Sequence, residues 1–301
     1  KRATTAKQLH NIRKRAHQVL KRYITQQIPI TFATKIISLV NESITQKVID
    51  LAIAEMPETP PTSFAWMALG SQGREEQLLL TDQDNALVFN NVNKDDYQNT
   101  QNYFLELSEK ITHGLNIVGF EFCPADMMGS NPKWCLSVSQ WNDQFKDWIT
   151  QPDQDNLMLC SIFFDFDYVY GDATLVESMS QGIFNSINKR DIFLNFLGLN
   201  ALKNPPPLSF FRQFLVEHDG EHKDQFDIKA RAMMPLVDAA RILILSKNIT
   251  SNNNTTGIGW KRRLKDNSGF MTTTFSNNLL INNFNQYADN IKETGLYFKN
   301  D

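Results

Sequence analysis

The chain has 301 residues, of which 42% are hydrophobic and 11% aromatic, so it holds enough apolar material to bury a sizeable core. This composition argues against intrinsic disorder. The 30 Lys and Arg residues and the 33 Asp and Glu residues give a net charge of -3, without the basic excess of a dedicated nucleic-acid-binding protein. Nucleic acid is therefore not an expected partner.

Cysteine content and apolar run length bear on the location of the protein. Cys123, Cys135 and Cys160 are odd in number and widely spaced, which fits neither a disulfide framework nor a Cys-x-x-Cys zinc site. No segment reaches the ~18 uninterrupted apolar residues of a membrane span, and no signal-peptide core follows the polar first residues. We expect a cytoplasmic protein with reduced thiols and no membrane partner. Because it starts at Lys1 and not at Met, it could be a fragment of a longer chain.

The first 60 residues are predicted to be helical. Phe32, Ile36, Val40, Ile44 and Val48 recur every four positions and mark one apolar face. Prolines at 57, 60 and 61 end this segment, because proline lacks an N–H and restricts the residue before it. The apolar face predicts a packing surface, and a homodimer would be one way to cover it.

Beyond the prolines the hydrophobic pattern is that of an α+β chain. Short apolar runs at 63–69 and 82–89 predict two strands, and residues 116–123 predict a third. A helical stripe from Phe104 to Leu115 separates the second strand from the third. From about residue 153 helical patterns predominate. We therefore expect three parts: N-terminal helices (1–60), a small mixed sheet with helices (61–150) and a C-terminal helical bundle (151–301).

The segment after the first predicted strand has the features of a phosphate-binding turn. Gly70 and Gly73 permit tight turns and close backbone approach, while Ser71 and exposed amides at a helix start can hold phosphate oxygens. Arg74 adds a positive charge nearby. A lone Gly-x-x-Gly is usually only a turn, so this segment is informative chiefly in combination with carboxylates downstream of it.

Two carboxylates open the second predicted strand. Asp82 and Asp84 are two positions apart, so the strand period of two places both on one face. Oxygen ligands that leave room for water and phosphate are typical of a Mg²⁺ site in phosphoryl or nucleotidyl transfer. A lone Asp-x-Asp is usually a solvated strand end, but its order and separation after Gly70-Ser71 are far more specific.

This arrangement resembles the nucleotidyltransferase superfamily of DNA polymerase beta, whose signature is Gly-Ser, about ten residues, then Asp-x-Asp. More closely, the stretch from Phe64 to Ala86 looks like the nucleotidyltransferases often fused to CBS or cyclic-nucleotide-binding domains, which are relatives of the protein-PII uridylyltransferases. Two further stretches, 123–134 and 163–172, match that family's pattern. The resemblance extends from about Ile30 to the end of the chain.

The resemblance implies a polymerase-beta-like sheet at 61–150 as the catalytic domain, followed by a helical substrate-binding domain. It implies that Asp82 and Asp84 are the catalytic residues and bind Mg²⁺, with two ions in the site, and that a nucleoside triphosphate is the substrate. It assigns the triphosphate to Gly70 and Ser71 and places Arg74 near the phosphates. Gly73 in the same turn and Lys133 after the third predicted strand complete the predicted nucleotide-binding residues. Upstream CBS or cyclic-nucleotide-binding domains would be partners in a longer chain.

Several positions keep two interpretations. Asn131, Lys133 and Trp134 combine an amide, a cation and a stacking plane that could bind base, ribose or phosphate. The more common alternative for such a stretch is a turn with Trp134 in the core. Lys229 could reach the triphosphate or could be a surface charge. The crowded acidic and His residues at 217–222 more often form a solvated loop than a zinc site.

The superfamily usually supplies a third carboxylate, and its place here is open. Glu121, Asp126, Asp165 and Asp167 are the candidates, and Asp167 stands where relatives usually carry arginine.

The leading hypothesis is a Mg²⁺-dependent transfer of a nucleoside monophosphate, uridylyl or adenylyl, to a hydroxyl acceptor, which could be on a signalling protein. The alternatives are a nucleotide-binding regulatory module with slow or no catalysis, and a small-molecule nucleotidyltransferase.

Overall fold

The computed structural model describes residues 3–26, 28, 30–74, 77, 81–188, 191–203 and 233–246, together with two strands at 257–263 and 270–276. Up to the second strand of the sheet, the described elements are α1 (Ala6–Thr25), α2 (Ile30–Ala54), β1 (Phe64–Ala68), α3 (Gly70–Gly73) and β2 (Asn85–Phe89). Next along the chain are α4 (Lys94–Val118), the 3-10 turn η1 (Pro132–Trp134), β3 (Cys135–Ser137), α5 (Val138–Thr150), α6 (Gln154–Phe163), β4 (Asp167–Gly171), α7 (Ala173–Ile187), α8 (Asp191–Ala201), α9 (Met234–Ser246), β5 (Gly257–Arg263) and β6 (Phe270–Ser276).

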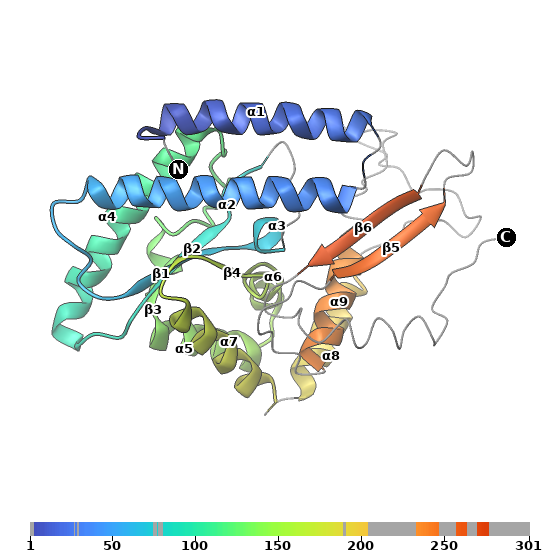
Figure 1. Cartoon of the computed structure of the whole chain (residues 1–301). Helices are drawn as coiled ribbons and strands as arrows, with labels where there is room; N and C mark the ends of the chain where they lie inside the picture. The colour runs from blue at the N-terminus through green and yellow to red at the C-terminus, as the bar shows by residue number, and fades with distance from the viewer. Residues whose placement is uncertain are drawn as a thin grey trace.

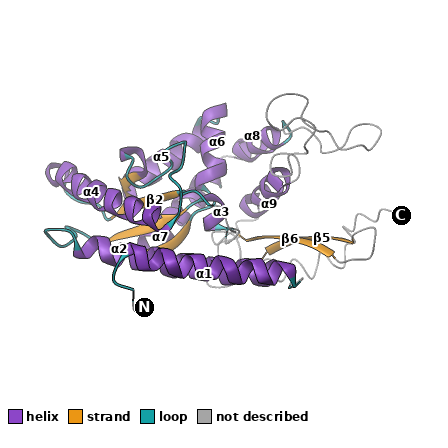
Figure 2. Ribbon diagram, turned by 90° about the horizontal axis from the view of Figure 1, so that it is seen from above, coloured by secondary structure: helices purple, strands orange, loops and turns teal. Residues whose placement is uncertain are grey.

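A four-stranded mixed sheet in the order β3-β2-β1-β4 forms the centre of the fold (Figure 1). Strand β1 is antiparallel to both β2 and β4, whereas β2 and β3 are parallel. Helices α2 and α4 lie on one side of the sheet, and α5 and α7 lie on the other (Figures 1 and 2). The predicted α+β class with a small mixed sheet, N-terminal helices and C-terminal helices is confirmed.

Every residue of β1 and β2 is buried, because each strand faces two separate cores. Along β1, Ala65 and Met67 face the core formed with α5, α6 and α7, whereas Phe64, Trp66 and Ala68 face the core formed with α2 and α4. This is the period of two expected for a strand. A strand covered on both faces has no polar alternation, which is why 64–69 is a continuous apolar run.

The apolar stripe predicted for the N-terminal helices lies on α2, but it is rotated from the expected position. Ile44 and Val48 are buried against α4 and the sheet, whereas Phe32 is 54% exposed. The true inner face of the helix includes Ala33 and Ile37. Most of the stripe is therefore covered within the chain itself, and the predicted homodimer stays a prediction.

The prediction of a strand at 116–123 is wrong. Helix α4 continues to Val118 and ends at Gly119, whose φ of 105° is accessible to glycine and whose N–H bonds to Leu115 and Asn116 carbonyls. Only Glu121 joins a strand-like pair, as an isolated parallel bridge with Asp82.

A second difference lies in the segment predicted as a helical bundle. Strand β4 pairs with β1, so part of 151–301 completes the central sheet, and β5 and β6 form a further antiparallel pair. Burial of Val169 explains β4, since this residue packs in the core with α2 and α4. Pro235 is the second residue of α9, where a missing N–H leaves no helix bond unmade.

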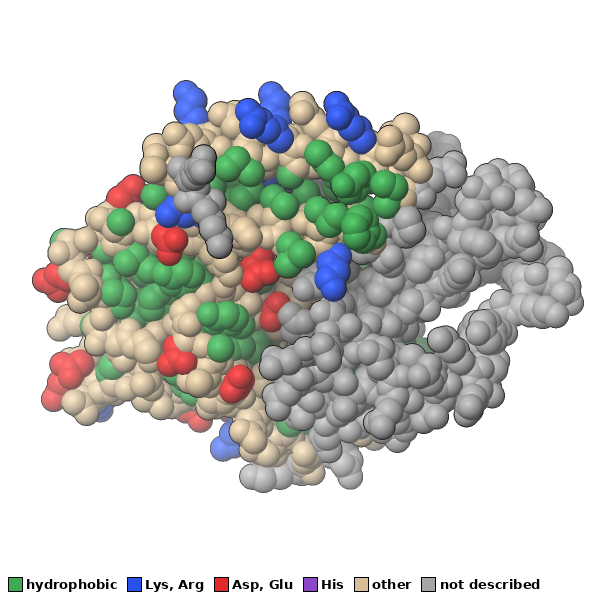
Figure 3. All heavy atoms as spheres, viewed as in Figure 1, with side chains coloured by type: hydrophobic (Ala, Val, Ile, Leu, Met, Phe, Trp, Pro, Cys, Tyr) green, Lys and Arg blue, Asp and Glu red, His purple; other side chains and the backbone are tan. Residues whose placement is uncertain are grey.

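The exposed cations of the N-terminal region gather on α1, which contains no Asp or Glu. Figure 3 shows Lys and Arg side chains along this helix at the top of the molecule. The exposed basic residues of α1 are Lys7, Lys14, Arg15, Lys21 and Arg22. The small net charge therefore conceals a basic surface on one helix. In the part of the chain that is described, no helix has the length and apolar character to cross a bilayer.

One buried cation fastens α1 to the segment that leads into β2. The Arg13 guanidinium donates hydrogen bonds to the Gly119 carbonyl and to Thr81 Oγ1, the latter at 2.6 Å, and lies 3.9 Å from the centroid of the Phe120 ring. Burial lowers the pKa of Arg13 to about 10, so the side chain stays charged at neutral pH. Since Thr81 precedes Asp82, this contact supports the extended segment that carries both aspartates, which lies just before β2 and not within the strand as predicted.

Replacing Arg13 by Met is expected to lower the free energy of unfolding by about 1–3 kcal/mol, because the Gly119 carbonyl and the Thr81 hydroxyl lose a charged donor in a buried place. Urea unfolding measures the change. The exposed neighbour Lys14→Met is the control and should stay within about 0.5 kcal/mol of wild type. Equal effects of the two substitutions would contradict the anchoring role of Arg13.

Candidate active site

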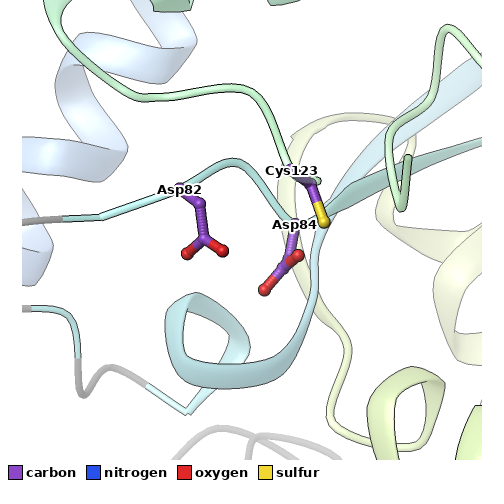
Figure 4. Close-up of side chains that lie close together, drawn as sticks. All are labelled: Asp82, Asp84 and Cys123. Atoms are coloured by element: carbon purple, nitrogen blue, oxygen red, sulfur yellow. The ribbon is translucent and has the colours of Figure 1, made fainter. Parts of the chain in front are cut away.

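The two aspartates face the same side of a short extended segment because the residue between them is buried. Gln83 is 2% exposed, and its amide donates to the carbonyls of Thr112 and Phe120 on and after α4. Asp82 is exposed and Asp84 is half-buried. The alternation of strand residues thus turns both carboxylates away from α4. The sequence predicted this shared face, and Figure 4 shows the two carboxylates side by side.

The Gly70-Ser71 turn lies directly beside Asp84. The Leu69 N–H donates to the Asp84 carbonyl at 2.9 Å, and the short helix α3 starts at the next residue. Gly70 has φ of 53°, a conformation that costs other residues energy, and a Cβ atom there would lie 3.5 Å from Asp84 Oδ2. Glycine is therefore favoured here by its backbone conformation, and the turn that it opens lies next to the Asp84 carboxylate.

Gly73 serves packing within the fold. A Cβ atom at this position would lie 2.0 Å from the Asp165 carbonyl oxygen, a distance that side chains do not tolerate. Its role in nucleotide binding stays a prediction, but its small size already has a structural cause. The residue lets α3 pack against the end of α6.

Gly73→Ala is expected to destabilise the protein by about 1–3 kcal/mol, because the added methyl group must displace backbone atoms. Gly198→Ala is the matched control, since it also lies in a helix but has no atom within 4 Å of the added carbon. There we expect a neutral or stabilising change of up to about 1 kcal/mol. Thermal unfolding of both variants measures the difference, and a neutral Gly73→Ala would contradict the close packing.

A thiol is the third group at the two aspartates. Ligand atoms of Asp82, Asp84 and Cys123 all lie within 4.8 Å of one another (Figure 4). Burial raises the pKa of the Cys123 thiol, and its hydrogen bond with Asp84 acts in the same direction. From the sequence, all three cysteines were classed together as reduced thiols, and the position of this one was missed. Its signal was its place at the start of the family-like stretch 123–134.

The four candidates for a third carboxylate lie elsewhere. Glu121 pairs with Asp82 through its backbone, but its carboxylate is not part of the cluster among the described residues. Asp126, at φ of 54°, accepts a hydrogen bond from Asn131. Asp167 lies on β4 and lines a small pocket together with residues of α2 and α3. Asp165 is buried in a different network.

Asp165 is held between two arginines. Arg74 Nη1 donates to Asp165 Oδ2 at 2.6 Å, and Arg241 donates to both Asp165 oxygens at 2.6 and 3.1 Å. Arg241 also pairs with Asp238 at 2.6 Å. Burial alone would raise the pKa of Asp165, but the charges of Arg241 and Arg74 lower it below its ordinary value. This network was not foreseen from the sequence, because its members come from the end of α6, from α9 and from the turn after α3.

The structure favours the turn interpretation of the stretch at 131–134. Asn131 Oδ1 accepts from the Lys133 N–H, and the Trp134 indole donates to the Asp126 carbonyl. Trp134 is 6% exposed and packs against Trp141 and Phe163. Lys133 is exposed on η1, and its proposed nucleotide contact is untested. Lys229 and the acidic and His residues at 217–222 lie outside the described residues.

Two models of known protein families match this chain. Residues 14–155 match the family described as "Putative nucleotidyltransferase DUF294", and residues 191–265 match the "Putative nucleotidyltransferase substrate binding domain" that belongs with it. No curated protein matches the chain. Together the two matches cover most of the chain and identify it as a member of this nucleotidyltransferase family, with a nucleotidyltransferase-type function.

The side chains at the site fit a divalent cation. Two carboxylates on one face supply the oxygen ligands that such ions take in proteins, and Gly70 leaves the space next to Asp84 Oδ2 free of a side chain. The thiol of Cys123 is a softer donor than the carboxylate that the superfamily usually supplies.

Proposed function

We propose that this protein transfers a nucleoside monophosphate from a nucleoside triphosphate to a hydroxyl acceptor, with a divalent cation, Mg²⁺ in the first instance, at Asp82 and Asp84. The observation that carries the proposal is the shared face of the two carboxylates beside the Gly70-Ser71 turn. In the reaction the acceptor oxygen bonds to the α-phosphorus, and the bond from that phosphorus to the α,β-bridging oxygen breaks. Pyrophosphate leaves, and the hydroxyl proton passes to water or to exposed Asp82.

The cation, when bound, neutralises negative charge that develops on the phosphates. Asp82 and Asp84 would hold it, and the buried Gln83 between them keeps their extended segment in position through its hydrogen bonds to α4 and Phe120. The family resemblance assigns the triphosphate to Gly70 and Ser71 and places Arg74 near the phosphates, while Gly73 and Lys133 are predicted nucleotide contacts from their residue types and positions. Arg74 is engaged by Asp165, so it would act partly by holding the turn after α3. The segment from α8 to α9 would contribute to substrate binding, as the name of its family match suggests.

A catalytically weak nucleotide-binding module is the second candidate. This candidate is favoured because, in the described part of the chain, the third group beside Asp82 and Asp84 is the Cys123 thiol and not one of the four candidate carboxylates. The first proposal alone requires a hydroxyl acceptor, on a signalling protein or another molecule, and a transferred uridylyl or adenylyl group.

The deciding experiment measures pyrophosphate release from each of the four nucleoside triphosphates with Mg²⁺, with and without cell extract as a source of acceptor. Cation-dependent release with one triphosphate would support transfer and would name the base. Nucleotide binding without release under any condition would overturn transfer and leave the regulatory module.

A further inference from the structure

Main-chain hydrogen bonds place Cys123 beside the aspartates. The segment after α4 runs parallel to the one before β2: the Glu121 N–H donates to the Thr81 carbonyl at 3.1 Å, and the Gln83 N–H donates to the Glu121 carbonyl at 2.8 Å. These bonds pair Asp82 with Glu121. Two residues further along each segment come Asp84 and Cys123, so the register itself brings them together.

The chain beyond Cys123 is also held. Its carbonyl accepts from the Asp126 N–H at 3.0 Å, and the Asn85 N–H donates to the Met127 carbonyl at 2.9 Å. The Asn85 side chain in turn accepts from the Gly129 N–H at 2.8 Å. Cys123 is 8% exposed, and its sulfur is directed toward Asp84 (Figure 4). The thiol is therefore a fixed part of the site.

Ligand chemistry distinguishes this site from one with three carboxylates. Mg²⁺ takes oxygen ligands in near-octahedral geometry, whereas thiolates select softer cations such as Zn²⁺. We propose that Cys123 is a protein ligand of the cation site, so that the site binds thiophilic divalent cations more tightly than Mg²⁺. Binding of such a cation forms a metal–sulfur bond and releases the thiol proton to the buffer.

Titration with Cd²⁺ in the absence of nucleotide tests this inference, which rests on the proposed function and deepens it by naming the class of cation. Wild type should show thiolate-to-metal charge-transfer absorption that is lost in Cys123→Ser and in the Asp82→Asn, Asp84→Asn double variant, whose thiols are intact. By calorimetry, Cys123→Ser should weaken Cd²⁺ binding about 100-fold and change Mg²⁺ binding little. Cys123→Asp should shift the preference toward Mg²⁺.

Absorption that persists in Cys123→Ser would assign the thiolate to Cys135 or Cys160 and overturn the inference. Cd²⁺ binding to wild type without the absorption would overturn it as well. The absorption requires no triphosphate, so it can appear in a protein that releases no pyrophosphate. Conversely, Mg²⁺-dependent release with no thiolate signal would retain the proposed function and remove Cys123 from the cation site. Circular dichroism of each variant, with Cys123→Ala as a second variant that lacks this thiol, shows that the fold is kept.

Discussion

Replacing Asp82 and Asp84 together by asparagine is expected to reduce cation-dependent pyrophosphate release by about a thousandfold or more. The two carboxylates are the oxygen ligands grouped at the site, and asparagine keeps their size but loses their charge. A metal ion contributes several kcal/mol to charge stabilisation in phosphoryl transfer. Because each ~1.4 kcal/mol of barrier changes the rate tenfold, loss of the ion corresponds to about a thousandfold loss of rate.

The same double variant should be at least as stable as wild type, because two like charges within 4.8 Å are removed from a solvent-accessible place. Two measurements separate the loss of activity from the change in stability: pyrophosphate release at saturating triphosphate, and unfolding by urea. Asp126→Asn is the control, since this exposed residue lies outside the cluster and asparagine tolerates its positive φ. Turnover that survives in the double variant would refute the assignment of the site.

Asp165→Asn is expected to cost about 3–5 kcal/mol in the free energy of unfolding. The substitution leaves the buried guanidinium group of Arg241 and the partly buried one of Arg74 without their shared carboxylate. Asp143→Asn, an exposed change on α5, should alter stability by no more than about 0.5 kcal/mol. Urea unfolding at neutral pH measures both, and a loss below about 1 kcal/mol would contradict a tightly coupled network.

The pH dependence of stability gives a second test of Asp165. Its pKa is lowered in the folded state from an ordinary value of 3.8. The carboxylate therefore contributes stability that is fully present above the ordinary pKa and is lost as the pH falls through the folded-state pKa. The difference in unfolding free energy between wild type and Asp165→Asn should accordingly shrink on acidification below about pH 4. A difference that grows in acid would have the wrong sign.

The Asp165 network also connects the two family-matched parts of the chain. Arg74 belongs to the first match and Arg241 to the second, while Asp165 lies between them in sequence. Because Arg74 follows α3, the shared carboxylate links α9 to the turn next to Asp84. A double-mutant cycle of Arg74→Gln and Arg241→Gln, read out as the free energy of unfolding, would measure this coupling.

Local patterns in the sequence were enough to predict several helices and strands and the shared face of the two aspartates. The apolar runs became β1 and β2, the stripe from Phe104 to Leu115 became α4, and the two-residue spacing placed Asp82 and Asp84 on one face. These features depend on periodicity and on turn residues, which act over a few neighbouring positions. The family signature rests on the same short segment.

Contacts between distant residues were decided only by the tertiary structure. Cys123 reaches Asp84 through a parallel pairing that a single bridge defines, and such a pairing leaves no periodic trace in the sequence. Asp165 and Arg241 are 76 positions apart, so nothing local could indicate that a candidate catalytic acid is instead a buried ion-pair partner. Strand β4 was hidden for the same reason: its partner β1 lies far earlier in the chain, and burial by that partner outweighs the helical character of its surroundings.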